Sequence, residues 1–100
     1  MRAQEGAVEW ERLTGSARIS DRPVVLFGIV ANGGGQASTV TIYDAPNASG
    51  EVFHTLHVPA SESKPLYFFD RGVELDFGLY LSLGGSIDEV TVFWAPLQRG

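Results

Sequence analysis

The sequence predicts an all-β protein, an antiparallel two-sheet β-sandwich of the jelly-roll kind with 7–8 strands. Three observations predict it: apolar residues alternate with polar ones in short runs, turn-forming residues separate these runs, and no segment has helical periodicity. Without helices to connect parallel strands, two packed antiparallel sheets are the simplest arrangement. A chain of 100 residues supports one core, so we predict a polar arm over residues 1–9 and one domain over 10–97.

The sequence signals for the first strands differ in strength. Residues 7–13 and 17–21 alternate weakly and predict an opening hairpin around Thr14–Ser16. Val24–Val30 is apolar at both odd and even positions. That pattern is expected of a strand covered on both faces, either in the middle of a sandwich or against a neighbouring subunit.

The middle of the chain predicts three more strands. Ser38–Tyr43 is rich in β-branched residues and sends Val40 and Ile42 to one face. Glu51–Val58 alternates in the same way, and a short apolar strand is expected at Leu66–Phe69. The glycine-rich segment 32–35 is expected to be a flexible hairpin loop.

The clearest strand signal is Val73–Leu83, where every odd position is apolar. A strand of this pattern sends one set of side chains to the core and the other set outward. Gly78 lies near its centre and indicates a bulge or bend that divides it. Val90–Trp94 alternates again and predicts the last strand.

Composition narrows the function classes. The net charge is −5, the pI is about 4.8 and the seven Lys and Arg residues are scattered, which argues against nucleic-acid binding. No apolar run approaches the length of a membrane span, and the polar amino terminus predicts a protein made in the cytoplasm and not secreted. The chain has no cysteine for a disulfide or a thiolate metal site.

Candidate chemistry is sparse. His54 and His57 are three residues apart on a predicted strand and therefore project from opposite faces, which excludes a shared metal ion unless the segment is a loop. No serine lies in a nucleophile-elbow pattern, and residues 32–35 lack the Lys and the helix of a phosphate-binding loop. We therefore predict no enzyme activity and no cofactor or metal.

Several aromatic residues lie on the strand faces opposite the expected core. Such rings indicate a buried interface or a ligand platform, since one face of each sheet in a monomeric sandwich is normally polar. Partial coverage by loops and by the amino-terminal arm is the alternative. The candidates for a protein interface are Trp10, Tyr43, Phe53, Tyr67, Tyr80 and Phe93.

Four segments together resemble small virion proteins of tailed phages, the capsid decoration or cement proteins. They are the apolar strand Val24–Val30, the Val-x-Ile-Tyr-Asp turn ending at Asp44, the Gly-Leu-Tyr-x-x-Leu motif of residues 78–83 and the closing strand Val90–Trp94. The resemblance covers about residues 20 to 95.

The resemblance implies a non-enzymatic β-sandwich that forms homo-oligomers, with a trimer favoured. It implies the major capsid protein as partner, and a place on the outer capsid surface of the virion after synthesis in the bacterial cytoplasm. A carbohydrate- or receptor-binding jelly roll of a phage fibre or tail is the alternative, because one fold serves both functions. A small hydrolase or isomerase on a cupin-like barrel would need a cluster of histidines, which two residues do not supply.

Overall fold

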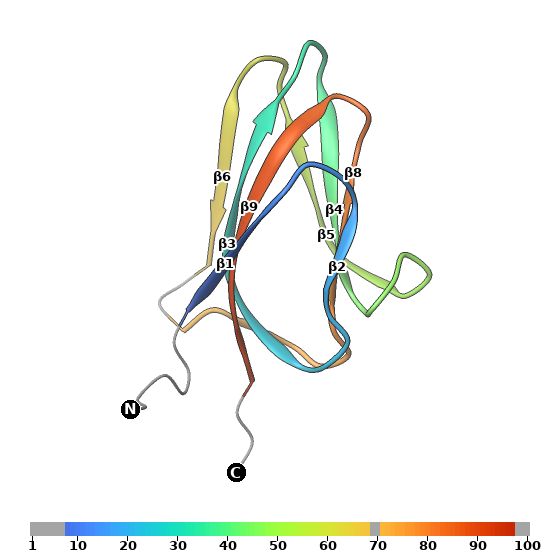
Figure 1. The fold of residues 1–100 in the computed structure, drawn as a ribbon, viewed down its shortest axis with the longest axis vertical. Helices are drawn as coiled ribbons and strands as arrows, with labels where there is room; N and C mark the ends of the chain where they lie inside the picture. The colour runs from blue at the N-terminus through green and yellow to red at the C-terminus, as the bar shows by residue number, and fades with distance from the viewer. Residues whose placement is uncertain (1–7, 69–70, 98–100) are drawn as a thin grey trace.

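The structure is a computed structural model, and it describes residues 8–68 and 71–97. Two antiparallel sheets lie face to face (Figure 1). The first, sheet A, contains β1 (Glu9–Leu13), β9 (Ile87–Pro96), β3 (Val24–Gly33), β6 (Ser63–Tyr67) and β7 (Val73–Leu75). The second, sheet B, contains β2 (Ala17–Ser20), β8 (Leu79–Leu83), β4 (Ser38–Asp44) and β5 (Glu51–Val58).

The predicted all-β sandwich is confirmed. Sheet A has the order β1-β9-β3-β6, with β7 also paired to β3, and sheet B has the order β2-β8-β4-β5. The described residues form nine strands, and the short β7 is the addition to the 7–8 expected. The pairs β1 with β9, β2 with β8, β3 with β6 and β4 with β5 are consistent with a jelly roll.

The core lies between the sheets and is apolar, and no polar or charged residue is buried within the described residues. Both sheets contribute to it, as the alternation in β4 and β9 predicts. Its buried members are Leu13, Val24, Leu26, Ile29, Ala31, Val40, Ile42, Leu56, Val58, Leu75, Leu79, Leu81, Ile87, Val90 and Val92.

The segment Val73–Leu83 forms two strands in different sheets. β7 pairs with β3 in sheet A, and β8 pairs with β4 in sheet B. Gly78 lies at the crossing with φ of 137°, and a Cβ there would be 2.6 Å from the carbonyl oxygen of Ser20. The predicted break at Gly78 is confirmed, but the alternation fails at Phe77, which is 69% exposed because the chain leaves one sheet there for the other.

In β3, a β-bulge explains why both parities are apolar. Leu26 is opposite Trp94 and Gly28 is opposite Phe93, so Phe27 is an extra residue in β3. The bulge changes which parity faces the core, from Val24 and Leu26 before it to Ile29 and Ala31 after it. Within the sandwich both faces of β3 are therefore not fully covered, since Val25, Phe27 and Val30 are half-buried. Cover by a neighbouring subunit, the other expected case, stays a prediction.

The opening hairpin around Thr14–Ser16 is also wrong. β1 pairs with β9 and β2 pairs with β8, so this turn connects the two sheets. Residues 1–7 of the predicted arm lie outside the described residues, whereas Glu9 already belongs to β1 and is opposite Trp94.

Two predicted segments have other boundaries or properties. β6 spans Ser63–Tyr67 instead of Leu66–Phe69, and Phe69 lies outside the described residues.

Segment 32–35 is held by backbone hydrogen bonds instead of forming a free hairpin loop. The N–H of Gly33 donates to the oxygen of Glu62 at 2.8 Å, and that of Gly34 donates to the oxygen of Ser86 at 2.6 Å.

Candidate docking surface

The six aromatic candidates divide among three places. Trp10, Phe93 and Tyr67 lie on the outer face of sheet A, in register with one another. Tyr43 and Tyr80 are opposite each other on neighbouring strands of sheet B. Phe53 packs against the core. No single face therefore contains the predicted set.

On sheet A these residues form one line across four strands. Trp10 is opposite Phe93, Phe93 is opposite Gly28, and Gly28 is opposite Tyr67. Residues directly opposite on antiparallel strands project to the same side of the sheet. We call these four residues the aromatic row.

The two ends of the aromatic row are open to solvent. Trp10 is 67% exposed on the edge strand β1 and Tyr67 is 65% exposed on the edge strand β6, while Phe93 between them is half-buried. Single exposed aromatics are common, but two exposed rings on one sheet face with a half-buried ring between them make that face a candidate for contact with a partner.

Gly28 sets the position of the Tyr67 ring. A Cβ at Gly28 would be 2.7 Å from Cδ1 of Tyr67 and 2.8 Å from the carbonyl oxygen of Leu66. Because a real Cβ is not found at such distances, the ring occupies space that a larger residue in β3 would take. The Tyr67 ring consequently lies against the sheet surface over Gly28, the residue opposite Phe93. Sequence reasoning missed this glycine, although a glycine inside a strand is a known signal of close approach.

Residues beside the aromatic row extend the apolar surface. In the next line of the sheet Val30 is opposite both Thr91 and Pro65. Val8, two residues before Trp10, is 53% exposed. The face therefore combines rings, aliphatic side chains and one threonine.

A polar network lies at one end of this face. The Arg12 guanidinium pairs with the Glu89 carboxylate, and the Asn32 amide donates to the other carboxylate oxygen of Glu89 at 2.8 Å. The Arg12 hydrogen bond, followed by that of Asn32, lowers the pKa of Glu89 below its ordinary value. The network therefore gives the apolar surface a polar border on this side.

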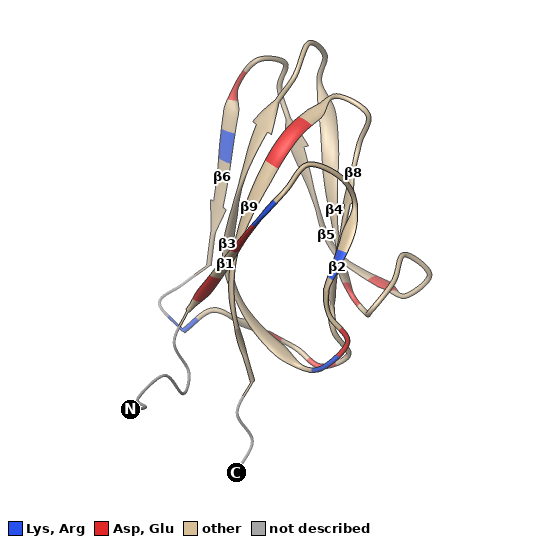
Figure 2. Ribbon diagram, in the orientation of Figure 1, with Lys and Arg blue, Asp and Glu red and all other residues tan. Residues whose placement is uncertain are grey.

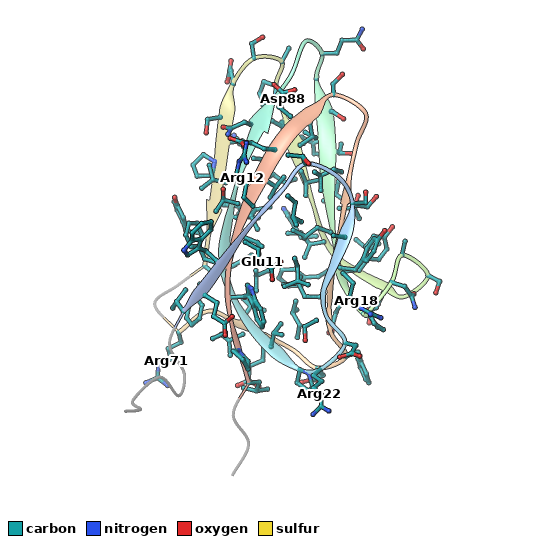
Figure 3. All side chains as sticks on the ribbon, in the orientation of Figure 1. Glu11, Arg12, Arg18, Arg22, Arg71 and Asp88 are labelled. Carbon is teal, nitrogen blue, oxygen red and sulfur yellow. The ribbon has the colours of Figure 1, made fainter. Side chains whose placement is uncertain are left out.

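Three arginines that are near one another in sequence do not form one patch. Arg12 lies in the network on sheet A, whereas Arg18 is opposite Tyr80 in sheet B and Arg22 lies in the turn after β2 (Figure 3). Arg12 and Arg18 are therefore on different sheets, and Arg22 lies in the connection between the sheets.

On sheet B the outer rings pack against each other. The ring centroids of Tyr43 and Tyr80 are 5.9 Å apart with an interplanar angle of 66°, an edge-to-face contact, and both residues are half-buried. Beside these rings, Thr41 is opposite Ser82 and Thr55, while Arg18 is opposite Tyr80 and the exposed Val52 is opposite Tyr43.

Phe53 does not project from the outer face as the alternation predicts. Ile42 is opposite His54 and Tyr43 is opposite Val52, so Phe53 is the extra residue of a bulge in β5. Its ring is 5.7 Å from that of Phe68, between the edges of the two sheets. The bulge, which no local sequence signal marks, turned it toward the core.

The two histidines lie on opposite faces of β5, as their spacing predicts. His54 and His57 are both exposed, and they are opposite Ile42 and Thr39, which face the core and the solvent respectively. Within residues 8–68 and 71–97 no three His, Cys, Asp or Glu side chains are grouped to hold a metal ion. No helix in that part of the chain is long and apolar enough to cross a membrane.

One shallow apolar hollow of about 280 Å³ lies beside the end of β5, and its lining is Ala37, Ser38, His57, Val58 and Pro59.

No known family model matches the sequence, and neither curated proteins nor solved structures contain a match.

Proposed function

We propose that this chain is a non-enzymatic structural protein that attaches to a larger protein assembly through the outer face of sheet A. The observation that carries the proposal is the aromatic row, with Trp10 and Tyr67 about two-thirds exposed on opposite edges of one sheet. Aromatic residues are enriched at protein interfaces, and their burial on binding removes apolar area from water.

The size of this face favours repeated weak contacts. Strands lie about 4.8 Å apart, so β1 and β6 are roughly 14 Å apart across the sheet. A stable protein interface needs about 800 Å² from each partner. The exposed rings of this row are Trp10 and Tyr67, so each copy contributes few apolar anchors. Many copies bound to one repetitive assembly offset weak individual contacts when they are linked to one another.

A tailed-phage capsid is such an assembly, and the resemblance to decoration and cement proteins makes it the specific form of the proposal. The partner is then the major capsid protein, and the chain lies on the outer capsid surface of the virion. The polar border at Arg12, Glu89 and Asn32 would orient the apolar surface on the partner.

Co-sedimentation with expanded heads of the phage that encodes the chain tests this proposal. We expect the wild-type protein at micromolar concentration to sediment with the heads, and a Trp10→Ser/Tyr67→Ser variant to lose at least tenfold in affinity. Phe77→Ser is the matched control, because Phe77 is equally exposed but lies outside the aromatic row.

Absence of wild-type binding would refute attachment to the capsid. Equal loss in the Phe77→Ser control would instead refute the role of the aromatic row. Circular dichroism of each variant would show whether the fold is retained.

A carbohydrate-binding module is the second candidate, and the position of Tyr67 favours it. A ring that lies against the sheet over Gly28, next to Phe93, is suited to stacking on the apolar face of a sugar. A glycan array separates the two functions, since saturable binding that the Trp10→Ser/Tyr67→Ser variant loses would support the sugar site.

A further inference from the structure

We propose that two copies of this chain pair along the free edge of β5, in antiparallel orientation about a two-fold axis at Leu56. The inference rests on the edge strands and is independent of the proposed function. No other described strand pairs with that edge of β5, which is the end of sheet B.

β5 differs from the other edge strands in charge. Charged residues at inner positions or short length protect sheet edges from pairing with other strands. β1 contains Glu11 and Arg12, β6 contains Lys64 beside Pro65, and β2 and β7 are four and three residues long. β5 has eight residues and one charge, at its first position, Glu51. A β-bulge can also protect an edge, and the bulge of β5 at Phe53 leaves the stretch His54–Val58 regular.

The uncharged stretch extends beyond β5, because residues 52–61 contain no Asp, Glu, Lys or Arg (Figure 2). Two interior strands show the same composition, since β8 has no charged residue and β3 lies within the uncharged segment 24–43. The interior strands β4 and β9 carry charges near one end, at Asp44 and at Asp88 and Glu89. β5 therefore has the composition of a strand with neighbours on both sides.

A second copy fits this edge by symmetry. His54–Val58 pairs regularly with β4, from Ile42 to Ser38, and is centred on Leu56. A two-fold axis there makes the two β5 strands antiparallel, with Thr55 opposite the partner's His57. All of His54–Val58 then pairs with the same stretch of the second copy. The chain carries a net charge of −5, and this edge brings no carboxylates together.

The bulge and the hollow complete the match. The two-fold axis at Leu56 sets His54 opposite the partner's Val58. Because Phe53 is the extra residue of the bulge, Val52 takes the next position along β5 and is opposite the partner's Pro59. Val52 is 49% exposed, and Pro59 lines the apolar hollow together with Val58. Pairing would thus cover an exposed valine with an apolar surface.

Sedimentation equilibrium of the full chain, from micromolar to about 100 µM, tests the proposal. We expect a dimer, and a dissociation constant raised at least tenfold by His57→Lys, which places two lysines at the centre of the paired edge. Ser63→Lys is the matched control, since Ser63 is exposed on the edge strand β6, and it should leave the dimer unchanged.

Amide hydrogen exchange supplies a second measurement. The outward amides of residues 54–58 should be protected in the wild type and exchange faster in His57→Lys, while the core strand β9 stays protected in both. A monomer at 100 µM, a trimer as the resemblance implies, or a dimer that His57→Lys leaves intact would each overturn the two-fold pairing.

Discussion

The two outer faces of the sandwich carry aromatic residues in different states. On sheet B, Tyr43 and Tyr80 lie on adjacent strands and pack edge to face, so each ring is half-buried within the chain. On sheet A, Trp10 and Tyr67 lie on the two edge strands. Phe93 and Gly28 lie between them, and Gly28 has no side chain to pack against Tyr67.

This difference shows that an outward aromatic is not by itself an interface signal. Rings that pack against each other on neighbouring central strands stabilise the monomer, as Tyr43 and Tyr80 do. Rings on edge strands have a neighbour on one side alone, so most of their surface stays available to a partner. The position of the strand in the sheet decides which case applies.

The largest expected effect comes from filling the gap in the aromatic row. Gly28→Val should lower the free energy of unfolding by about 3 kcal/mol, because its Cβ overlaps Tyr67 and the oxygen of Leu66. Urea denaturation measures the loss. Gly35→Val is the control, since a Cβ at Gly35 meets nothing within 4 Å. Unchanged stability of Gly28→Val would show that the Tyr67 ring is not fixed in place.

The two faces should also respond differently to loss of a ring. Tyr80→Ser should cost about 1–3 kcal/mol of stability, and Tyr67→Ser about 0.5 kcal/mol or less, because one ring is packed and the other is exposed. A double-mutant cycle with Tyr43→Ser should give a coupling of about 0.5–1.5 kcal/mol. Equal losses at Tyr80 and Tyr67 would remove the distinction between the faces.

The smallest effect concerns the polar border of sheet A. The lowered pKa of Glu89 means that its network stabilises the fold above the ordinary pKa of 4.5, and that this contribution is lost as the pH falls through the lowered value. Thermal melts between about pH 5 and pH 3 should show a slightly smaller decline for Glu89→Gln than for the wild type. Parallel curves would exclude a role of the network in stability.

Much of the fold was predictable because the alternation of apolar and polar residues indicates which side chains face the core. Val40, Ile42, Leu79, Leu81, Val90 and Val92 are all fully buried as their parity predicts. Gly78 marked the break in the longest alternating segment, and its φ of 137° explains the glycine.

Several failures share a physical cause, since bulges and crossings change which parity faces the core. Phe27 and Phe53 are extra residues in bulges, and Phe77 lies where the chain moves between sheets. Which outward rings meet was also not predictable, because the cross-strand register of Trp10, Phe93 and Tyr67 depends on segments far apart in sequence.

The pairing of β1 with β9 has a consequence for how the chain folds. Glu9 is opposite Trp94, so sheet A closes only when residues at the two ends of the domain meet. Contacts so distant in sequence carry a large loop-closure cost and slow folding, typically into milliseconds to seconds for β-sandwiches. A circular permutant that links these neighbouring ends and opens the exposed connection 14–16, whose flanking strands β1 and β2 do not pair with each other, should make β1–β9 a local hairpin and fold faster.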